Sequence, residues 1–421
     1  MGGSTPSIPG QKMTGADLWD LRTRVAQLLD RSNTGFPGAQ PVSFAARHKL
    51  ELQKQDYFVC EKSDGIRCLM FLTNDPNMQE ATFLIDRKND YYLVPDLHFP
   101  KSAENPEPFH TDTILDGELV NDTIIDPDLG PRTQLMYLVF DCLVLNGDRL
   151  MHQTLDKRIG HFTEFVYNPY KKLYDRFPGE REHLPFLVDW KMMERGYGIE
   201  KMFKETLPKL PHGNDGLIFT CRTTPYQFGT DQHILKWKPA QENSVDFRMT
   251  LDFPMVEPDT DDEEQTPYPD YTALPQVKLS VHGGDRDGDI PYGAMYLDNV
   301  RWEELKALKE PLNDRIVECY LMESNIWSFL RFRDDKQEAN HISTVESVME
   351  SILDKVSEED LIEASKSIRD EWKKRERETE AQKAAMARAA TNGHASQARN
   401  ANIGAKRKFE GDDTANGFDG V

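Results

Sequence analysis

The chain has 421 residues, of which 72 are acidic and 51 are basic, so its formal net charge is −21 at pH 7. This length allows two domains and a tail, because domains usually contain roughly 100 to 200 residues each. The negative charge excludes a protein that coats nucleic acid through bulk charge, so any RNA contact must use a local basic cleft.

The sequence argues against disulfide bonds, a zinc site and a membrane-spanning segment. The five cysteines are scattered, odd in number and without a CxxC pair, which argues against a disulfide framework and a zinc site. The longest apolar stretch, 135–145, is interrupted by Asp141 and is too short to span a bilayer. We therefore expect a soluble protein of a reducing intracellular compartment, without a membrane partner.

The N-terminal segment changes character after residue 12. Residues 1–12 are polar and rich in Gly, Ser and Pro, and we expect them to be disordered. Five apolar residues then recur at helical spacing and predict an amphipathic helix from about Asp17 to Asp30.

Short β-rich runs dominate from Tyr57 to Trp237, and several are bounded by Asp-Gly or Asn-Gly, which are typical of tight turns. Helical patterning appears between them, near 156–165 and 198–207. We therefore predict an α+β domain over 13–240, built largely on antiparallel sheets.

Five short β-rich runs follow over 241–342 and predict a small barrel such as an OB-fold. Between the first two runs, 257–270 is acidic and Pro-rich, which predicts an exposed loop insertion.

The C-terminal region is predicted to be helical over 343–388, where Ser357 and Asp360 offer a capping box. Residues 389–421 lack apolar periodicity, and we expect a disordered tail. The basic cluster Lys406–Lys408 is compatible with a nuclear-import signal, but three residues leave that open.

Lys62 is the candidate nucleophile. In the run EKSDGIR, 61–67, it lies between a β-rich segment and an Asp-Gly pair, so its amine should project from a strand end. An amine attacks phosphorus only when neutral, and desolvation or neighbouring cations supply that form near pH 7. An ordinary surface lysine beside a hairpin is the alternative.

Further chemistry-bearing residues follow in a fixed order. Asp116-Gly117-Glu118 and Asp215-Gly216 place carboxylates beside β-rich runs, where they could hold Mg²⁺ for phosphoryl transfer, although each pair alone is more often just a turn. Strand alternation puts Lys236 and Lys238 on one face and Trp237 on the other. Such a lysine pair would bind a nucleotide α-phosphate and help to keep the Lys62 amine neutral.

This ordered set resembles the covalent nucleotidyltransferase superfamily, which comprises capping guanylyltransferases and ATP- or NAD-dependent ligases. The resemblance covers about 36–336, and Lys62 matches the nucleotidyl-lysine. It implies an α+β nucleotidyltransferase domain, ATP-grasp-like as in ligases and capping enzymes, followed by an OB-fold β-barrel.

Several segments resemble capping enzymes in particular. The run FPGAQPVSF, 36–44, is similar to the segment that precedes their active lysine, and 83–92 is similar to their ribose-contacting motif. The resemblance implies that Arg87 contacts the sugar hydroxyls, that Phe140 stacks on guanine and that Arg67 belongs to the GTP-binding set.

Two segments of the predicted barrel extend the resemblance. Ser244-Val-Asp-Phe247 is similar to a motif that opens the capping OB domain, and RFRDDK, 331–336, is similar to the last capping motif. In that motif basic residues orient the β and γ phosphates of GTP when the domains close. The resemblance assigns this role to Arg331, Arg333, Asp334 and Lys336.

The family resemblance implies a two-step reaction. Lys62 would take GMP from GTP as a lysyl-GMP intermediate, with Mg²⁺ or Mn²⁺ near Glu118 and Asp215, and pass it to the 5′ diphosphate end of RNA. Glu118 could instead orient Lys62. The chain resembles the stand-alone guanylyltransferases of fungi, which implies a separate RNA 5′-triphosphatase subunit, the phosphorylated C-terminal domain of RNA polymerase II as partner, and the nucleus as location.

The same residues are compatible with two alternative functions. An ATP-dependent polynucleotide ligase shares the lysine chemistry, but the capping-type segments argue against it. A non-catalytic scaffold that binds RNA polymerase would be expected to lose residues such as Lys62 and Lys236, which are present.

Overall fold

The computed structural model describes residues 6–126, 130–257, 266–284, 286–322 and 324–409, with side chains as far as Met386. The chain divides into two compact units, 1–366 and 367–421. Among the described residues, the first unit contains two large sheets, a barrel, a two-stranded ribbon and most of the helices. The second is formed, as far as Phe409, by the continuation of helix α9 (Glu358–Phe409).

The larger sheet has the strand order β1-β6-β5-β4-β7-β8-β10 among the described residues, with β9 paired to β8. Neighbouring strands are antiparallel except β10 and β8. The strands are β1 (Gln11–Lys12), β4 (Ile66–Asn74), β5 (Glu80–Asp86), β6 (Tyr91–Val94), β7 (Thr113–Asp126), β8 (Gly130–Leu145), β9 (Asp148–Arg149) and β10 (Leu187–Trp190).

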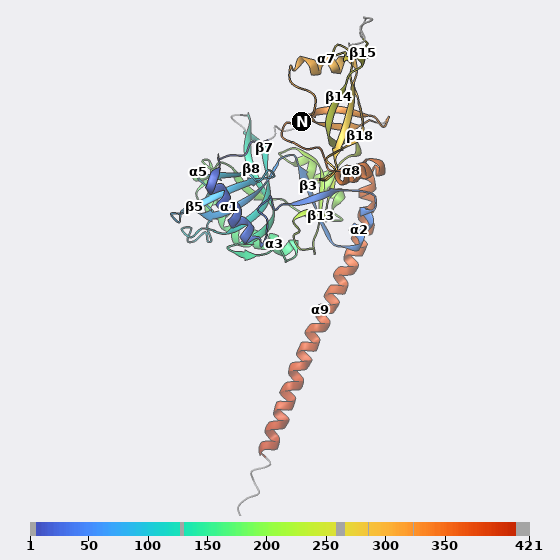
Figure 1. Cartoon of the computed structure of the whole chain (residues 1–421). Helices are drawn as coiled ribbons and strands as arrows, with labels where there is room; N and C mark the ends of the chain where they lie inside the picture. Colours follow the sequence, from blue (N-terminus) through green and yellow to red (C-terminus); the bar gives the residue numbers. More distant parts are fainter. Residues whose placement is uncertain (1–5, 127–129, 258–265, 285, 323, 410–421) are drawn as a thin grey trace, which may run out of the picture. The chain divides into compact units, whose positions relative to one another are not determined.

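Both faces of this sheet are covered, which explains why β4 is a continuous apolar run without alternation. Met70 and Leu72 pack into one hydrophobic cluster with Tyr170 of α4 (Asn168–Arg176). Leu69 packs into the other with Val25 of α1 (Gly15–Leu28), the helix predicted near Asp17 to Asp30. Figure 1 shows α1 lying against the strands of this sheet.

The smaller sheet carries Lys62. Its order is β11-β3-β12-β13-β2 within the described residues, and β13 and β2 are parallel. The strands are β2 (Ala39–Ser43), β3 (Tyr57–Ser63), β11 (Glu194–Arg195), β12 (Asn214–Cys221) and β13 (Gly229–Trp237). The two sheets confirm the predicted α+β, largely antiparallel architecture.

The five predicted C-terminal strands form a closed barrel of order β14-β17-β18-β20-β19. Strands β18 and β20 are parallel, and α7 (Asn299–Ala307) lies between β18 and β19 in the chain. This arrangement confirms the predicted OB-type barrel. Its strands are β14 (Ser244–Asp252), β17 (Gln276–His282), β18 (Asp289–Tyr296), β19 (Ile316–Leu321) and β20 (Trp327–Phe332).

The remaining helical segments connect these layers. The two regions of predicted helical patterning are helical, partly as π-helix. The segments are α2 (His48–Lys54), α3 (Leu155–His161), η1 (Phe162–Tyr167), α5 (Pro178–Arg181), α6 (Ile199–Lys201), η2 (Met202–Thr206), η3 (Leu207–Lys209), η4 (Ala240–Glu242) and α8 (Ile342–Asp354).

The prediction of disorder over 1–12 is wrong for the described part of this segment. Gln11 and Lys12 form β1, which pairs antiparallel with β6, and Ile8 packs against the hydrophobic cluster beneath the sheet. The physical reason is that β6 would otherwise be an edge strand with unpaired backbone groups. Residues 1–5 lie outside the described residues.

The predicted disordered tail over 389–421 is also corrected in part, because α9 runs to Phe409. The segment contains many alanines and no proline, and alanine favours a helix even where apolar periodicity is missing. The side chains of the Lys406–Lys408 cluster and all of 410–421 lie outside the described residues.

The acidic insertion is described only at its flanks, since 258–265 lie outside the described residues. The flanks β15 (Met255–Val256) and β16 (Tyr268–Pro269) pair as a two-stranded antiparallel ribbon, and Tyr268 is exposed.

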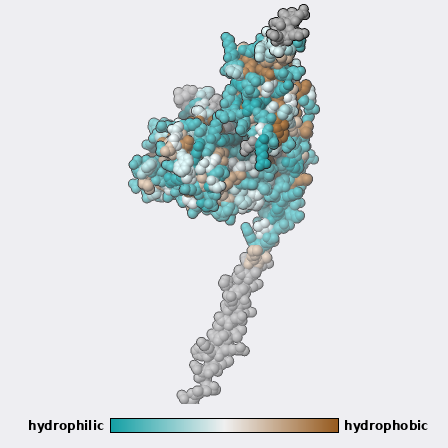
Figure 2. Space-filling view, in the orientation of Figure 1, coloured by the Kyte–Doolittle hydropathy of each residue, from teal (hydrophilic) through white to brown (hydrophobic). Residues whose placement is uncertain are grey.

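All five cysteines are buried and free. None of the helices that the structure describes combines the length and the apolar content needed to cross a membrane. Hydrophilic residues cover most of the face shown in Figure 2, with smaller hydrophobic patches among them.

Candidate active site

Lys62 lies near the end of β3 and is held by a carboxylate from the neighbouring strand. Its Nζ donates to Asp215 Oδ1 at 2.7 Å and to Oδ2 at 3.0 Å. Both side chains are one-quarter exposed, so the pair stands at the boundary between sheet and solvent. The predicted nucleophile therefore projects from a strand end, as expected.

Strand β13 and the residue after it supply the predicted lysine pair. Lys238 Nζ lies 2.5 Å from Asp215 Oδ2, so one carboxylate is shared by Lys62 and Lys238. Trp237 points to the opposite face, is 4% exposed and donates from Nε1 to the carbonyl of Val356 at 2.9 Å. The predicted alternation is confirmed.

Burial and neighbouring charges shift the pKa values of Lys236 and Asp215 in this cluster. Burial, followed by the charges of Lys62 and Lys238, lowers the pKa of Lys236 to about 8. Burial acts to raise the pKa of Asp215, but Lys62 and Lys238 outweigh it, so this pKa lies below its usual value. The cluster has three amines and one carboxylate, which is the electrostatic character of an anion site.

Two glycines of the Asp-Gly pairs are required by close packing. A Cβ on Gly65 would lie 2.2 Å from the carbonyl oxygen of Leu119, and one on Gly216 would lie 2.0 Å from that of Trp237. Gly216 also has φ = +143°, a value that favours glycine. These glycines let β4 approach β7 and let β12 approach β13, which brings Lys62, Asp215 and Lys238 together.

A cavity of about 850 Å³ adjoins this cluster. It is lined from both sheets and from the barrel. The predicted site residues on its wall are Lys62, Arg67, Arg87, Glu118, Phe140, Lys236, Lys238, Arg331, Arg333 and Lys336.

Glu118 reaches this cavity from β7 and is paired with a lysine that sequence analysis missed. Lys191, which follows β10, donates from Nζ to Glu118 Oε2 at 2.8 Å, and its side chain is only 3% exposed. The same Nζ lies 5.5 Å from the centre of the Phe140 ring. Lys191 directly follows the short run that forms β10. This position at a strand end was the only local feature in the sequence that could have marked Lys191 as a site residue.

Arg67 is bound inside the protein. Its guanidinium donates to both carboxylate oxygens of Asp116, at 3.0 Å from Nε and 2.6 Å from Nη2, and Asp116 is fully buried. Its Cζ lies 5.5 Å from the centre of the Phe140 ring. Arg67 therefore lines the cavity beside the Phe140 ring, which it helps to position. Its Nε and Nη2 groups are already bound to Asp116.

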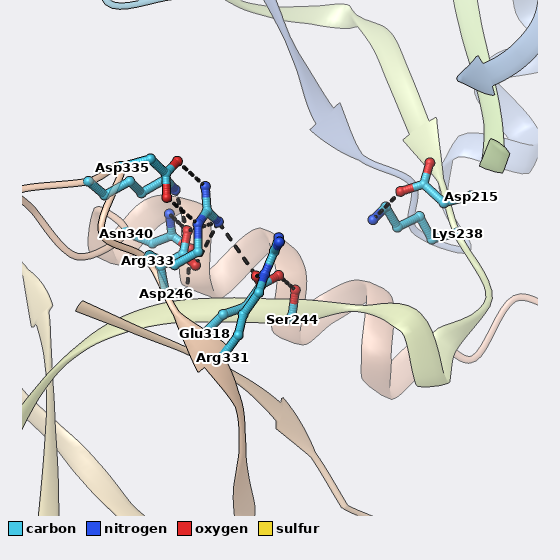
Figure 3. A network of polar contacts seen from close by, with 10 residues as sticks. Asp215, Lys238, Ser244, Asp246, Glu318, Arg331, Arg333, Asp335 and Asn340 are labelled. Atoms are coloured by element: carbon cyan, nitrogen blue, oxygen red, sulfur yellow. Dashed lines mark hydrogen bonds and ion pairs between the residues drawn. The ribbon is translucent and has the colours of Figure 1, made fainter. Parts of the chain in front are cut away.

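The barrel contributes a second cluster, in which basic side chains are paired with acidic ones (Figure 3). Arg333 donates to Asp246 Oδ1 at 3.0 Å and to Asp335 Oδ2 at 2.8 Å. Lys336 also donates to Asp246, and Arg331 donates to Glu318 Oε2 at 2.6 Å.

Sequence analysis missed the acidic partners Asp246 and Glu318. Asp246 lies within the SVDF segment quoted above, so the segment gave a signal for it, whereas Glu318 is brought near only by the pairing of β19 with β20. Both carboxylates are buried, at 6% and 11% exposure. In this arrangement they form ion pairs with Arg331, Arg333 and Lys336, the residues that the resemblance assigns to the phosphates of GTP.

Asp334 is a predicted residue that neither lines the cavity nor contacts the lysine cluster. Its carboxylate is 76% exposed and pairs with Arg315 at 2.7 Å. The neighbouring Asp335 lines the cavity instead.

Of the two predicted metal ligands, Glu118 lines this cavity, whereas Asp215 is bound to Lys62 and Lys238, which line it. Among the described residues, no three His, Cys, Asp or Glu side chains gather closely enough to hold a metal by themselves. Mg²⁺ is commonly held by one or two carboxylates together with substrate phosphates, so the donor set present fits such a shared site.

Family models match both parts of the chain. The model described as mRNA capping enzyme, catalytic domain, matches residues 4–240, and the one described as mRNA capping enzyme, C-terminal domain, matches 242–362.

Similar proteins point the same way. The mRNA-capping enzyme subunit alpha of Neurospora crassa is 50% identical over 376 residues, which cover 87% of this chain and 93% of that protein. The subunit alpha of Schizosaccharomyces pombe is 46% identical over 374 residues, covering 88% and 90%. The ATP-dependent DNA ligase of bacteriophage T7 in complex with ATP overlaps 70% of this chain and 98% of its own, with 13% identity and a TM-score of 0.33, too loosely to support an inference.

These matches favour guanylyl transfer over the ligase and scaffold alternatives. The chain therefore belongs to the mRNA capping enzyme family, as a guanylyltransferase of the subunit-alpha type.

Proposed function

We propose that Lys62 carries GMP as a covalent lysyl-GMP intermediate and passes it from GTP to the 5′ diphosphate end of RNA. The observation that carries this proposal is the cluster of Lys62, Lys236 and Lys238, in which the carboxylate of Asp215 pairs with Lys62 and Lys238. A nucleotide α-phosphate beside these amines would supply the negative charge that the cluster lacks.

The cavity wall supports a pose for the nucleotide. Phe140, backed by Arg67 and Lys191, offers a ring on which guanine stacks. Arg87, on the same wall, contacts the ribose hydroxyls in this pose. Lys236 and Lys238 then bind the α-phosphate.

In the first half reaction, the Lys62 ammonium passes a proton through Asp215 to solvent, and the neutral amine attacks the α-phosphorus in line. A bond forms between Nζ and phosphorus, the nitrogen releases a second proton to solvent, the bond from phosphorus to the bridging oxygen breaks, and pyrophosphate departs with that electron pair. Lys236 and Lys238 offset the charge that develops on the α-phosphate oxygens.

Mg²⁺ or Mn²⁺ held by Glu118 and Asp215 would offset charge on the phosphates of GTP. The sequence left two roles open for Glu118, as metal ligand or as a group that orients Lys62. The hydrogen bond from Lys62 to Asp215 supports an orienting role for Asp215, and we therefore assign Glu118 to the metal rather than to Lys62.

The barrel supplies the groups that align the leaving pyrophosphate. Arg331, Arg333 and Lys336 line the cavity and are now paired with Glu318, Asp246 and Asp335. Closure about a hinge at 239–242, between a nucleotidyltransferase domain over 13–240 and a barrel domain over 241–342, would exchange these carboxylates for phosphates. Opening would release pyrophosphate and admit RNA.

In the second half reaction, a terminal oxygen of the RNA 5′ diphosphate attacks the phosphorus of lysyl-GMP. The bond between nitrogen and phosphorus breaks, and the amine of Lys62 takes up a proton. The subunit-alpha names of the relatives support assembly with a further subunit. We propose that this subunit is an RNA 5′-triphosphatase, which would supply this end. We place the protein in the nucleus, with the phosphorylated C-terminal domain of RNA polymerase II as a further partner.

The RNA end tests this proposal. Protein, GTP and Mg²⁺ are incubated with one RNA carrying a 5′ diphosphate or a 5′ monophosphate, and cap formation is measured by nuclease digestion. We expect capping of the diphosphate RNA alone. Joining of RNA ends in the presence of ATP, without capping, would overturn the proposal in favour of a ligase.

A further inference from the structure

A buried row of charges lies behind Lys62. Because side chains alternate along β3, Glu61 points away from the face that carries Lys62 and is 4% exposed. The imidazole of His212 lies between two carboxylates, with Nδ1 2.7 Å from Asp122 Oδ1 and Nε2 3.8 Å from Glu61 Oε1. The His212 side chain is 5% exposed.

The row continues on the other side of Glu61. Burial acts to raise the pKa of Glu61, but His212 and Lys191 outweigh it and lower this pKa. Lys191 is bound in turn to Glu118, which lies four residues before Asp122 on β7 and so shares its face. Charges of alternating sign therefore run from Asp122 through His212, Glu61 and Lys191 to Glu118.

The charge of His212 balances this row. Burial acts to lower the pKa of His212, but its contacts with Asp122 and Glu61 raise it to about 9. A neutral imidazole would leave the carboxylates of Asp122, Glu61 and Glu118 facing one cation, Lys191. Such repulsion between buried like charges would push β3 away from β7.

The backbone around His212 joins the same two strands. The carbonyl of Pro211 accepts from Thr123 N on β7 at 2.8 Å, and the carbonyl of Gly213 accepts from Asp64 N, in the turn after Lys62, at 2.9 Å. Asp215, which binds the Lys62 amine, follows two residues later. One short segment thus fixes both the turn beside Lys62 and the amine itself.

We propose that His212 is a positioning residue for the reaction at Lys62: as an imidazolium it ties Glu61 of β3 to Asp122 of β7 and so fixes the strand end that presents the nucleophile. It touches neither nucleotide nor RNA in this role. The inference rests on the proposed function of Lys62, and its tests separate the two.

The first test uses His212→Asn, which retains a donor near Nδ1 for Asp122 but carries no charge. The single-turnover rate constant of lysyl-GMP formation at saturating GTP is expected to fall at least about tenfold. The affinity for a GTP analogue that cannot react is expected to remain within about twofold, because no group in the cavity changes. The matched control is His98→Asn, which alters a histidine–carboxylate pair with Glu80 remote from Lys62 and should leave the rate constant unchanged.

The pH profile separates positioning from a steric effect. His212 loses its charge as the pH rises through about 9, so wild type loses the advantage of the imidazolium there. The ratio of wild-type to His212→Asn rate constants is expected to be constant near neutral pH and to fall towards one well above that pKa. Taking the ratio cancels any pH dependence that both proteins share. A ratio independent of pH would overturn the proposal.

A second variant guards against misfolding. Asp122→Asn should lower the rate constant by a similar factor, and the double variant should lower it no further than either single variant, because both remove one pairing. Additive losses, or a His212→Asn rate equal to that of wild type, would overturn the positioning role. If wild type itself acquired no label from GTP, the proposed function of Lys62 would fail instead.

Discussion

The ammonium group of Lys62 is held by both carboxylate oxygens of Asp215, at 2.7 and 3.0 Å. Lys238, the residue after β13, binds the same carboxylate. The nucleophile is therefore aimed before any nucleotide arrives, and the positive charge around it is only partly balanced. Positioning of this kind lowers the barrier to an in-line attack.

Replacing Asp215 with Asn keeps the shape and removes the charge that aims Lys62. The rate constant of lysyl-GMP formation is expected to fall by roughly 10- to 100-fold, the scale of a lost hydrogen bond to a charged group. Asp252→Asn, at an exposed pair with Lys278, serves as the control and should have no effect. A rate equal to wild type in Asp215→Asn would contradict the account.

Lys236 should make stability depend on pH in an unusual direction. Its pKa is about 8 in the folded protein and near 10.5 in the unfolded chain. Between these values the unfolded chain binds more protons than the folded protein. The contribution of Lys236 to the free energy of unfolding should therefore increase as the pH rises from about 8 towards 10.5. In Lys236→Met this gain should disappear, as measured by urea denaturation across the range. An identical pH dependence in both proteins would refute the prediction.

Arg67 should matter chiefly for stability. Arg67→Met leaves the carboxylate of Asp116 buried without its partner, which is expected to cost about 3–5 kcal/mol of unfolding free energy. Urea denaturation measures the loss. Lys204→Ala, which removes an exposed pair with Glu200, is the control and should change stability little. Stability equal to the control, together with weaker GTP binding, would return Arg67 to a direct role in the site.

Arg333 should act in one half reaction more than in the other. Arg333→Ala is expected to slow lysyl-GMP formation at least about tenfold, because the β and γ phosphates lose a guanidinium partner. Transfer from preformed lysyl-GMP to diphosphate RNA should change less, because pyrophosphate has already departed. The two steps are measured separately by single-turnover kinetics. Equal losses in both would count against closure of the barrel over GTP.

The central residues of the site were predictable because their signals are local. The Asp-Gly pair after Lys62 and the alternation of Lys236, Trp237 and Lys238 are readable along the chain. The glycines of those pairs proved to serve close strand packing, since Gly216 lies inside β12 with no room for a Cβ. Local sequence thus indicated residues that lie together in the structure, but it gave turn formation as the role of glycines that serve strand packing.

The supporting residues were not predictable because strand register brings them together. Arg67 reaches Asp116 because β4 pairs with β7 in a register that sets them diagonally across the two strands. Lys191 and His212 come from loops distant in sequence, and neither carries a motif. Asp334 was misplaced because two adjacent aspartates follow Arg333, and only the geometry of the turn shows that Asp335 faces the cavity.

The most direct test of the account is whether GTP leaves GMP on Lys62. The protein is incubated with GTP or ATP labelled at the α-phosphate and with Mg²⁺, denatured, and digested for mass spectrometry, with Lys62→Ala in parallel. The account predicts a GMP adduct on the peptide containing Lys62, formed from GTP, reversed by pyrophosphate and absent from the variant. An adduct formed from ATP instead, an adduct on another residue, or none in the folded protein would contradict it.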